Sequence, residues 1–258
     1  MHIQALSSED LSNELLFDTY VIDDLKSFDE LFGVYEDYKR NNPNKVIILT
    51  LDDLGQAEYT SGHSIHSYDL DETEDHDLSN LDEVCFENGE HRGYLSTPSE
   101  FFIRKTNLLK QAKDIDFESV CDKNMTIDED EMLILEGINQ SPFEYLDEQI
   151  ELKVVPVDKS YEGICGFPNG YFESDFDPFE NYIIAKHLFE NYQFELFGIG
   201  ASILGFKRDN SLEESKLKEL ITDLSKLYNT SEEAFDKFAE IIRDKKYLFL
   251  KYTEGLEA

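Results

Sequence analysis

The sequence contains no run of about 18 apolar residues, the length that a membrane-spanning helix requires. Its first residues, MHIQALSSEDLSNELL, lack the basic segment and apolar core of a secretory signal. The three cysteines, Cys85, Cys121 and Cys165, are widely spaced and form no CxxC pair. They predict neither a disulfide framework nor a zinc site, and each is expected to be a small core residue. These absences predict a cytoplasmic protein without a membrane segment.

Motifs that carry known catalytic chemistry are also missing. There is no P-loop, no GxSxG elbow, no HExxH and no GxGxxG after a strand. The segment from Gly198 to Gly200 lacks the third glycine of a dinucleotide loop and predicts a tight turn. Adjacent acids such as Asp52 and Asp53 can act as acid and base, but in a chain with 57 acids such pairs arise by chance. The sequence therefore favours a protein that is not an enzyme and needs no cofactor.

Basic residues are scarce, since 23 Lys and Arg face 57 Asp and Glu, for a net charge of −34. About 2–8 charges are enough to keep a small domain soluble, and a larger excess destabilises the compact state by repulsion. Residues 206–258 hold ten bases and twelve acids, so −32 of the charge belongs to residues 1–205. Such a field excludes direct binding to nucleic acid or to anionic membranes and favours a basic protein partner.

The acids are densest from Tyr68 to Glu90, where YDLDETEDHDLSNLDEVCFENGE holds ten carboxylates in 23 residues and no Lys or Arg. Interspersed apolar residues predict that this segment packs on the body of the protein and presents a negative surface for recognition. These are Leu70, Leu78, Leu81, Val84 and Phe86.

A metal site is the alternative for this segment, because His63 and His66 precede the acids and imidazole suits zinc. An EF-hand loop that began at Asp69 would place Glu74 where glycine is required and Asn80 where a bidentate Glu belongs. On a strand, the two histidine rings would point to opposite faces. The segment therefore predicts an acidic loop that attracts cations weakly, and no specific metal site.

A second acidic stretch, NGYFESDFDPFENY, places aromatic rings beside carboxylates. Large rigid rings next to carboxylates are typical of protein interfaces, although a loop that covers the core with a solvated rim is the alternative. His187, on the helix that follows, is expected to be a packed or rim residue. The predicted partner-binding residues of the two segments are Tyr68, Asp69, Asp71, Glu72, Glu74, Asp75, Asp77, Tyr171, Glu173 and Asp175.

Capping signals and the spacing of apolar residues predict helices over residues 28–42, 97–114, 128–135, 177–192, 211–227 and 231–243. Strands are predicted over residues 46–53, 150–157, 161–167, 194–206 (a pair that turns at 198–200) and 245–253. Short strands and turns are predicted over residues 61–70 and 83–96.

This alternation predicts an α+β (mixed α/β) fold with antiparallel or mixed sheets flanked by amphipathic helices. The sequence has no internal repeat and no linker rich in Pro, Ser or Gly. A boundary near residues 140–149 would divide an acidic N-terminal α/β region, residues 1–145, from a C-terminal α/β region, residues 146–258. A single continuous domain is the alternative.

Residues 163–206 combine a glycine-aromatic-proline-asparagine turn, a helix and a glycine-containing aromatic strand. This pattern resembles an uncharacterised bacterial domain family of the toxin-immunity type. Phe167 stands where that family's pattern has Trp. The resemblance implies an immunity role and brings no catalytic residues. The matching positions are Gly166, Pro168, Asn169, Asp177, Leu188, Gly198 and Leu204.

The leading hypothesis is an acidic binding protein that neutralises a basic partner, most concretely an immunity protein against a nuclease-type toxin. Nucleases have basic clefts because they grip phosphates, and carboxylates can occupy such a cleft. The alternative is a phage-type DNA mimic that inhibits a host DNA-binding or defence protein. A structural acidic protein and a cation-dependent enzyme are less favoured.

Overall fold

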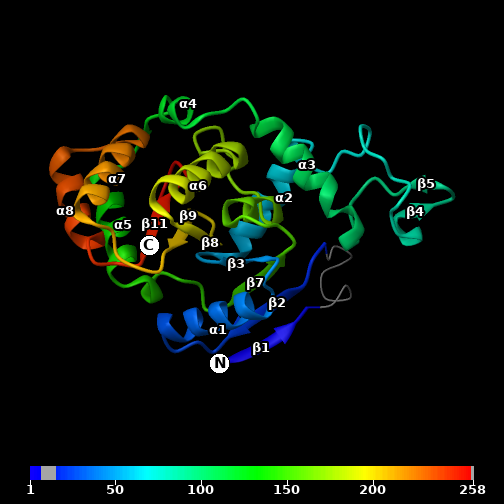
Figure 1. Ribbon diagram of the computed structural model, residues 1–258, viewed down its shortest axis with the longest axis horizontal. Helices are drawn as coiled ribbons and strands as arrows, with labels where there is room; N and C mark the ends of the chain where they lie inside the picture. Colours follow the sequence, from blue (N-terminus) through cyan, green and yellow to red (C-terminus); the bar gives the residue numbers. More distant parts are fainter. Residues whose placement is uncertain (7–15, 257–258) are drawn as a thin grey trace.

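A seven-stranded mixed sheet forms the centre of the computed structural model, which describes residues 1–6 and 16–256 (Figure 1). The strand order is β1-β2-β7-β3-β8-β9-β11, in which β3 and β8 are parallel and the other neighbours are antiparallel. The predicted α+β fold class is thereby confirmed. The strands are β1 His2–Ala5, β2 Thr19–Asp23, β3 Val46–Thr50, β7 Ile150–Val155, β8 Glu195–Ile199, β9 Ile203–Lys207 and β11 Tyr247–Lys251. Two small sheets pair β4 Phe86–Glu87 with β5 Glu90–His91, and β6 Met125–Thr126 with β10 Tyr228–Asn229.

Most helices begin at the capping residues that the sequence indicates. The Ser27 hydroxyl accepts a bond from Glu30 N, and the Asp177 carboxylate accepts from Phe179 N and Glu180 N. Such caps satisfy N–H groups that a helix leaves unpaired in its first turn. The helices are α1 Phe28–Asn41, α2 Leu54–Ser67, α3 Phe101–Ala112, α4 Phe117–Cys121, α5 Glu129–Gln140, α6 Pro178–Tyr192, α7 Glu214–Leu227 and α8 Glu232–Ile242. The 3₁₀ helices are η1 Glu83–Cys85, η2 Pro98–Glu100, η3 Pro142–Glu144 and η4 Ser160–Gly166.

The sheet is covered on both faces (Figure 1). Helix α1 lies on one face, where Phe32 and Tyr35 pack against Phe197 of β8 with ring centroids 5.2 and 6.0 Å apart. On the other face η4 and α6 lie over the strands. Here η4 runs so close that a Cβ on Gly163 would lie 2.5 Å from Cδ1 of Ile48. Helices α5, α7 and α8 pack together beyond β11 at one end of the sheet.

The strand predicted over residues 161–167 is wrong, because this segment forms η4. The preceding strand β7 cannot pair with it, because β7 lies between β2 and β3 and both of its edges are bonded. The short apolar segment instead packs flat on the sheet. Its glycines allow this close approach.

The short strands predicted over residues 61–70 are also wrong, because residues 54–67 form helix α2. Asp53 caps this helix by accepting a bond from Gln56 N (3.0 Å). The face that α2 buries consists of Ala57, Thr60, Ser61 and Ser64. Because these side chains are small and mostly polar, their helical spacing leaves no hydrophobic periodicity in the sequence.

The sheet takes strands from both sides of residue 145. Strand β7 is inserted between β2 and β3, so residues 1–145 and 146–256 build one sheet and share one hydrophobic core. A boundary near residues 140–149 would therefore divide the strands of one sheet and would not separate two sheets.

Helix α5 also protects the outer edge of β11. Asn139 Nδ2 donates to Phe249 O (3.0 Å), and Phe249 N donates to Asn139 Oδ1 (2.9 Å). The buried amide side chain thus makes the pair of bonds that a further strand would make. This arrangement closes an edge that would otherwise expose backbone groups to other chains.

We expect Asn139→Ala to lower the free energy of unfolding by about 2–4 kcal/mol, because two buried backbone groups of Phe249 lose their partners at about 1–3 kcal/mol each. Urea unfolding measures this change. Gln140→Ala, at the exposed end of the same helix, is the matched control. Equal stability of the two variants would show that Asn139 does not hold the edge.

Candidate functional site

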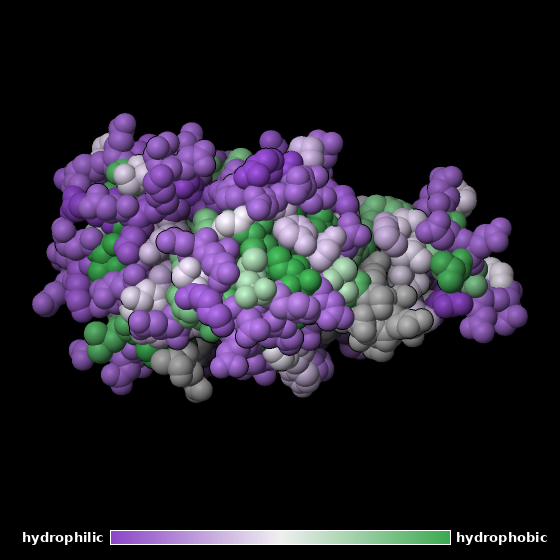
Figure 2. Space-filling model, turned by 90° about the horizontal axis from the view of Figure 1, so that it is seen from below, coloured by the Kyte–Doolittle hydropathy of each residue, from purple (hydrophilic) through white to green (hydrophobic). Residues whose placement is uncertain are grey.

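Residues 68–100 leave the body as an arm between the end of α2 and the start of α3, with the β4–β5 hairpin near its tip (Figure 1). Viewed from below, this acidic arm stands clear at one end of the molecule, and hydrophilic residues cover most of the face (Figure 2). The arm contains the whole of the acidic stretch from Tyr68 to Glu90.

A buried polar cluster joins the β4–β5 hairpin of the acidic arm to η2. His91 Nε2 lies 2.7 Å from Glu100 Oε1, and the backbone N–H groups of Ser96 and Thr97 donate to Glu100 Oε2 (2.8 Å each). Burial alone would raise the pKa of Glu100, but the bonds from Ser96 N, His91 and Thr97 N hold it below its ordinary value. The returning half of the arm is therefore held on η2, next to the start of α3, by a charged carboxylate.

Two predicted contact residues of the arm already have a basic partner on α3. Arg104, which is buried, donates from Nε to Asp71 Oδ1 and from Nη2 to Asp71 Oδ2, both at 2.7 Å. Lys110 Nζ lies 2.9 Å from an Asp75 carboxylate oxygen in an exposed pair. Sequence reasoning missed both bases because they come from a different element. Asp71 is therefore a structural residue.

The other acids between Tyr68 and Glu90 have no such base. Each is exposed and forms no ion pair within residues 1–6 and 16–256. These acids are Asp69, Glu72, Glu74, Asp77, Asp82, Glu83, Glu87 and Glu90.

The aromatic and apolar residues of the arm differ from the expectation that all of them pack on the body. Tyr68 does so: its ring meets Phe179 at 5.1 Å, and burial, followed by the charge of Asp177, raises its pKa to about 12. Leu70 is buried in the core, and Leu78 and Leu81 pack partly against it. The two residues nearest the tip do not reach the core, because Val84 is 54% exposed and Phe86 packs on His91.

The second predicted segment, residues 171–175, is a turn rather than a flat contact surface. Asp175 is only 2% exposed, and its carboxylate accepts bonds from Phe172 N (3.2 Å) and Glu254 N (2.9 Å). Burial raises the pKa of Asp175. It therefore ties the turn to the C-terminal residues and cannot contact a partner directly. Tyr171 is half-buried against His63, and Glu173 is exposed.

Beside this turn lies a cleft of about 530 Å³ beyond the carboxyl end of β3. Four acids line it, and no Lys, Arg or His does. We call it the carboxylate cleft. Its lining residues are Asp52, Asp53, Gln56, Phe172, Asp175, Ala201, Ser202, Thr253, Glu254 and Gly255.

Asp52 is a half-buried acid of the carboxylate cleft. Its Oδ2 accepts bonds from the Ser202 N–H (2.9 Å) and the Ser202 hydroxyl, whereas its Oδ1 is buried and accepts no hydrogen bond from any residue described. A Cβ on Gly200 would lie 1.6 Å from Oδ1, so only glycine fits there. Burial raises the pKa of Asp52 to about 6, against the lowering effect of Ser202. Sequence reasoning attributed this acid to chance.

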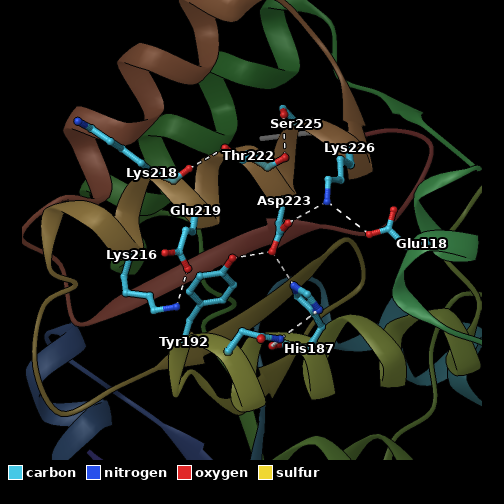
Figure 3. Close-up of polar contacts among 11 residues, drawn as sticks. Glu118, His187, Tyr192, Lys216, Lys218, Glu219, Thr222, Asp223, Ser225 and Lys226 are labelled. Atoms are coloured by element: carbon cyan, nitrogen blue, oxygen red, sulfur yellow. Dashed lines mark hydrogen bonds and ion pairs between the residues drawn. The ribbon is translucent and has the colours of Figure 1, made fainter.

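His187 belongs to a polar network between α6 and α7 (Figure 3). Its Nε2 lies 2.7 Å from an Asp223 carboxylate oxygen, to which the Tyr192 hydroxyl also donates (2.5 Å), and its ring stacks on Phe117 at 3.6 Å. Burial would raise the pKa of Asp223, but the bonds from Tyr192, His187 and Lys226 hold it low. The network joins α4, α6 and α7, so His187 is a packed residue.

The cysteines are small packing residues. Burial, followed by the charge of Glu162, raises the pKa of Cys165 to about 12, and burial, followed by Glu118, raises that of Cys121 to about 11. Cys85 lies buried beside the Thr97 hydroxyl, 3.2 Å from its oxygen. The raised pKa values of Cys165 and Cys121 mean that these two thiols are not activated as nucleophiles.

The structure also bears on the metal and membrane hypotheses. His63 and His66 lie three residues apart on helix α2, so the expectation that a strand separates their rings is wrong. Among residues 1–6 and 16–256, no three His, Cys, Asp or Glu side chains are grouped to hold a metal ion. No helix in this part of the chain has the length and apolar character needed to cross a membrane.

We expect Asp71→Asn to destabilise the fold by about 2–4 kcal/mol, because it leaves the buried Arg104 charge unpaired. Loss of one partner of a fully buried pair costs about 3–5 kcal/mol, and the cost here is smaller because the Asp71 side chain is 23% exposed. The matched variant Asp75→Asn, which breaks the exposed pair with Lys110, should leave stability unchanged. Thermal and urea unfolding measure both. If the two variants were equally stable, the Arg104 pair would not hold the arm.

Asp52 should make stability depend on pH in an unusual direction. In the folded state Asp52 keeps its proton up to about pH 6, whereas its ordinary pKa is 3.8. Ionisation of Asp52 therefore lowers the free energy of unfolding as pH rises between these two values, and the loss remains at higher pH. Asp52→Asn removes this effect, and its unfolding free energy relative to the parent should rise by up to about 3 kcal/mol between about pH 4 and pH 7. Urea unfolding over this range measures the difference, with Asp53→Asn as the control. A difference that stayed constant with pH would contradict the burial of this charge.

Comparisons of the chain with protein-family models, with curated proteins and with solved structures found no match. What the chain binds therefore has to be inferred from its own charges and cavities.

Proposed function

We propose that this chain is a cytoplasmic acidic protein that binds and neutralises a basic protein partner, most concretely an immunity protein that inhibits a cognate nuclease-type bacterial toxin. The observation that carries the proposal is the acidic arm, which projects from the body with eight exposed acids that have no basic partner in the described residues. The resemblance of residues 163–206 to the toxin-immunity type of domain supports the same function.

The charge of the arm suits the active site of a nuclease. A nuclease binds phosphates with Lys and Arg, so its cleft is positively charged and attracts carboxylates from a distance. Complementary charge speeds association, whereas tight binding also needs apolar contacts. Val84, which is 54% exposed, and Tyr94 offer such contacts within the arm.

The way in which the arm is attached favours binding. The bonds of Glu100 to His91, Ser96 and Thr97 hold the hairpin of the arm on η2. The ion pair of Asp71 with Arg104 fixes the arm to α3. A fixed arm loses less conformational freedom when it binds, so more of the interaction energy remains as affinity. The pairs that stabilise the fold also position the arm.

We expect association with the partner, captured from the native host, to be steered by charge. Raising ionic strength from about 0.01 M to about 0.15 M shortens the Debye length from about 30 Å to about 8 Å and should slow association by roughly tenfold or more. Stopped-flow kinetics measure this rate. An association rate that did not change with salt would contradict the proposed function.

A matched pair of variants locates the contact. The triple variant Glu72→Gln, Glu74→Gln, Asp77→Asn neutralises the arm and spares Asp71 and Asp75, so the fold should be retained and association should slow several-fold. The control Asp114→Asn, Glu148→Gln, Asp236→Asn removes the same charge from exposed sites elsewhere. If both triple variants associated at the same rate, net charge and not the arm would be recognised. A captured nucleic-acid-binding protein without nuclease activity would favour the DNA-mimic alternative.

A further inference from the structure

The chain contains two Asn-Gly dipeptides, one at residues 88–89 and one at residues 169–170. In such a dipeptide the side-chain amide of asparagine can react with the next backbone nitrogen, because glycine has no Cβ to hinder the approach. The reaction requires that the two groups can move together and that water reaches them. The structure places the two dipeptides in opposite surroundings.

Asn88 and Gly89 form the turn of the β4–β5 hairpin, near the tip of the acidic arm (Figure 1). Their φ angles are +55° and +87°, as in a type I′ turn, and both residues are exposed. A Cβ on Gly89 would meet no atom within 4 Å beyond its neighbours in the chain. The Asn88 carboxamide and the Gly89 N–H make no hydrogen bond with any residue that the structure describes. Both reacting groups are therefore open to water.

This turn is held closed only weakly. The β4–β5 ladder has two residue pairs, and the pair next to the turn places Glu87 opposite Glu90. Like charges directly opposite each other destabilise an antiparallel pair. The turn can therefore open locally while the rest of the fold stays intact, and the Asn88 side chain can then reach Gly89 N.

The second dipeptide has none of this freedom. Asn169 is 1% exposed, its Nδ2 donates to Ala57 O (3.1 Å), and its Oδ1 accepts from the Thr60 hydroxyl (2.5 Å). A Cβ on Gly170 would lie 1.9 Å from Phe176 O, so the backbone is closely packed there as well. The same two residue types are thus fixed in the core, which makes them an internal control.

We propose that Asn88 is a site of spontaneous deamidation. The Gly89 backbone nitrogen attacks Cγ of Asn88 and forms a C–N bond. The bond from Cγ to the side-chain nitrogen breaks, and ammonia leaves with the proton of Gly89 N. Water then opens the resulting cyclic imide and returns a proton to that nitrogen. Opening at Cγ gives aspartate, and opening at the main-chain carbonyl carbon gives isoaspartate, in which the backbone runs through Cβ and Cγ.

Both products change the tip of the arm. Each adds a carboxylate between Glu87 and Glu90, and isoaspartate also lengthens the backbone of a turn that has only two residues. The reaction goes beyond the proposed function and does not depend on it. Only its effect on binding would rest on the arm as the contact for a basic partner.

The test is incubation of the full chain in mildly alkaline buffer, followed by peptide mapping with mass spectrometry and by enzymatic methylation of isoaspartate. We expect Asn88 to convert at least about tenfold faster than Asn169, which reacts only after part of the core has opened. Asn80, which is exposed in the same arm but precedes leucine, should also convert more slowly than Asn88. Conversion of Asn88 no faster than that of Asn169 or Asn80 would overturn the proposal.

Unfolding the chain in urea shows whether the structure causes the difference. Without the fold, the two Asn-Gly dipeptides should convert at rates within about threefold of each other. If Asn169 stayed unreactive in the unfolded chain, burial would not be what protects it, and the structural argument would fail.

A matched pair of variants tests the attacking group. Gly89→Ala places a methyl group beside the attacking nitrogen and should slow conversion of Asn88 several-fold. Gly93→Ala is the control, because Gly93 is an exposed glycine of the same arm with a φ of +81°. Equal conversion of Asn88 in both variants would contradict attack by Gly89 N. These measurements need no partner, so their failure is distinguishable from failure of the proposed function.

Discussion

The scarcity of bases is the constraint on which this structure depends. Each buried carboxylate needs a base or several hydrogen-bond donors, and with 23 bases for 57 acids most acids must do without a base. Several of the available bases lie inside the fold. Lys251 is fully buried and pairs with Glu131 while it donates to Thr126 O (3.1 Å), and Arg104 pairs with Asp71. The bases thus hold interior carboxylates in place, and the surface is left with an excess of negative charge.

This constraint explains why the two acidic regions differ. In the arm, exposed acids are solvated by water, so their mutual repulsion is weak and they can gather on a small projecting element. In the carboxylate cleft, Asp52 is shielded from water and has only Ser202 to bond it, and burial therefore raises its pKa to about 6. The arm holds its charge at little cost to folding, whereas the cleft holds a charge that destabilises the folded state.

Sequence patterns predicted the elements whose signals are local and missed those that depend on distant residues. Most helices were predicted from capping residues such as Ser27 and Asp177 and from the helical spacing of apolar residues. Two central strands were predicted from the apolar runs that begin at Val46 and Ile150. The strand predicted over residues 161–167 failed because β2 and β3 already flank β7, which no local pattern reveals. The site shows the same division. The density of acids indicated the arm, but Asp71 meets Arg104 33 positions away and Asp52 meets Ser202 150 positions away. Such pairs exist only once distant parts of the chain have folded together.

The proposed function depends on how the charges of the arm act through water. Charges on the arm act through water over a Debye length of about 8–10 Å, so salt weakens them and they govern how fast a partner arrives. Asp52, whose pKa is raised by burial to about 6, instead acts on the stability of the fold. In the proposed complex, a basic protein would meet the field of the arm first and bind where its acids are densest. The negative charge that destabilises this chain on its own would thereby be compensated in the complex.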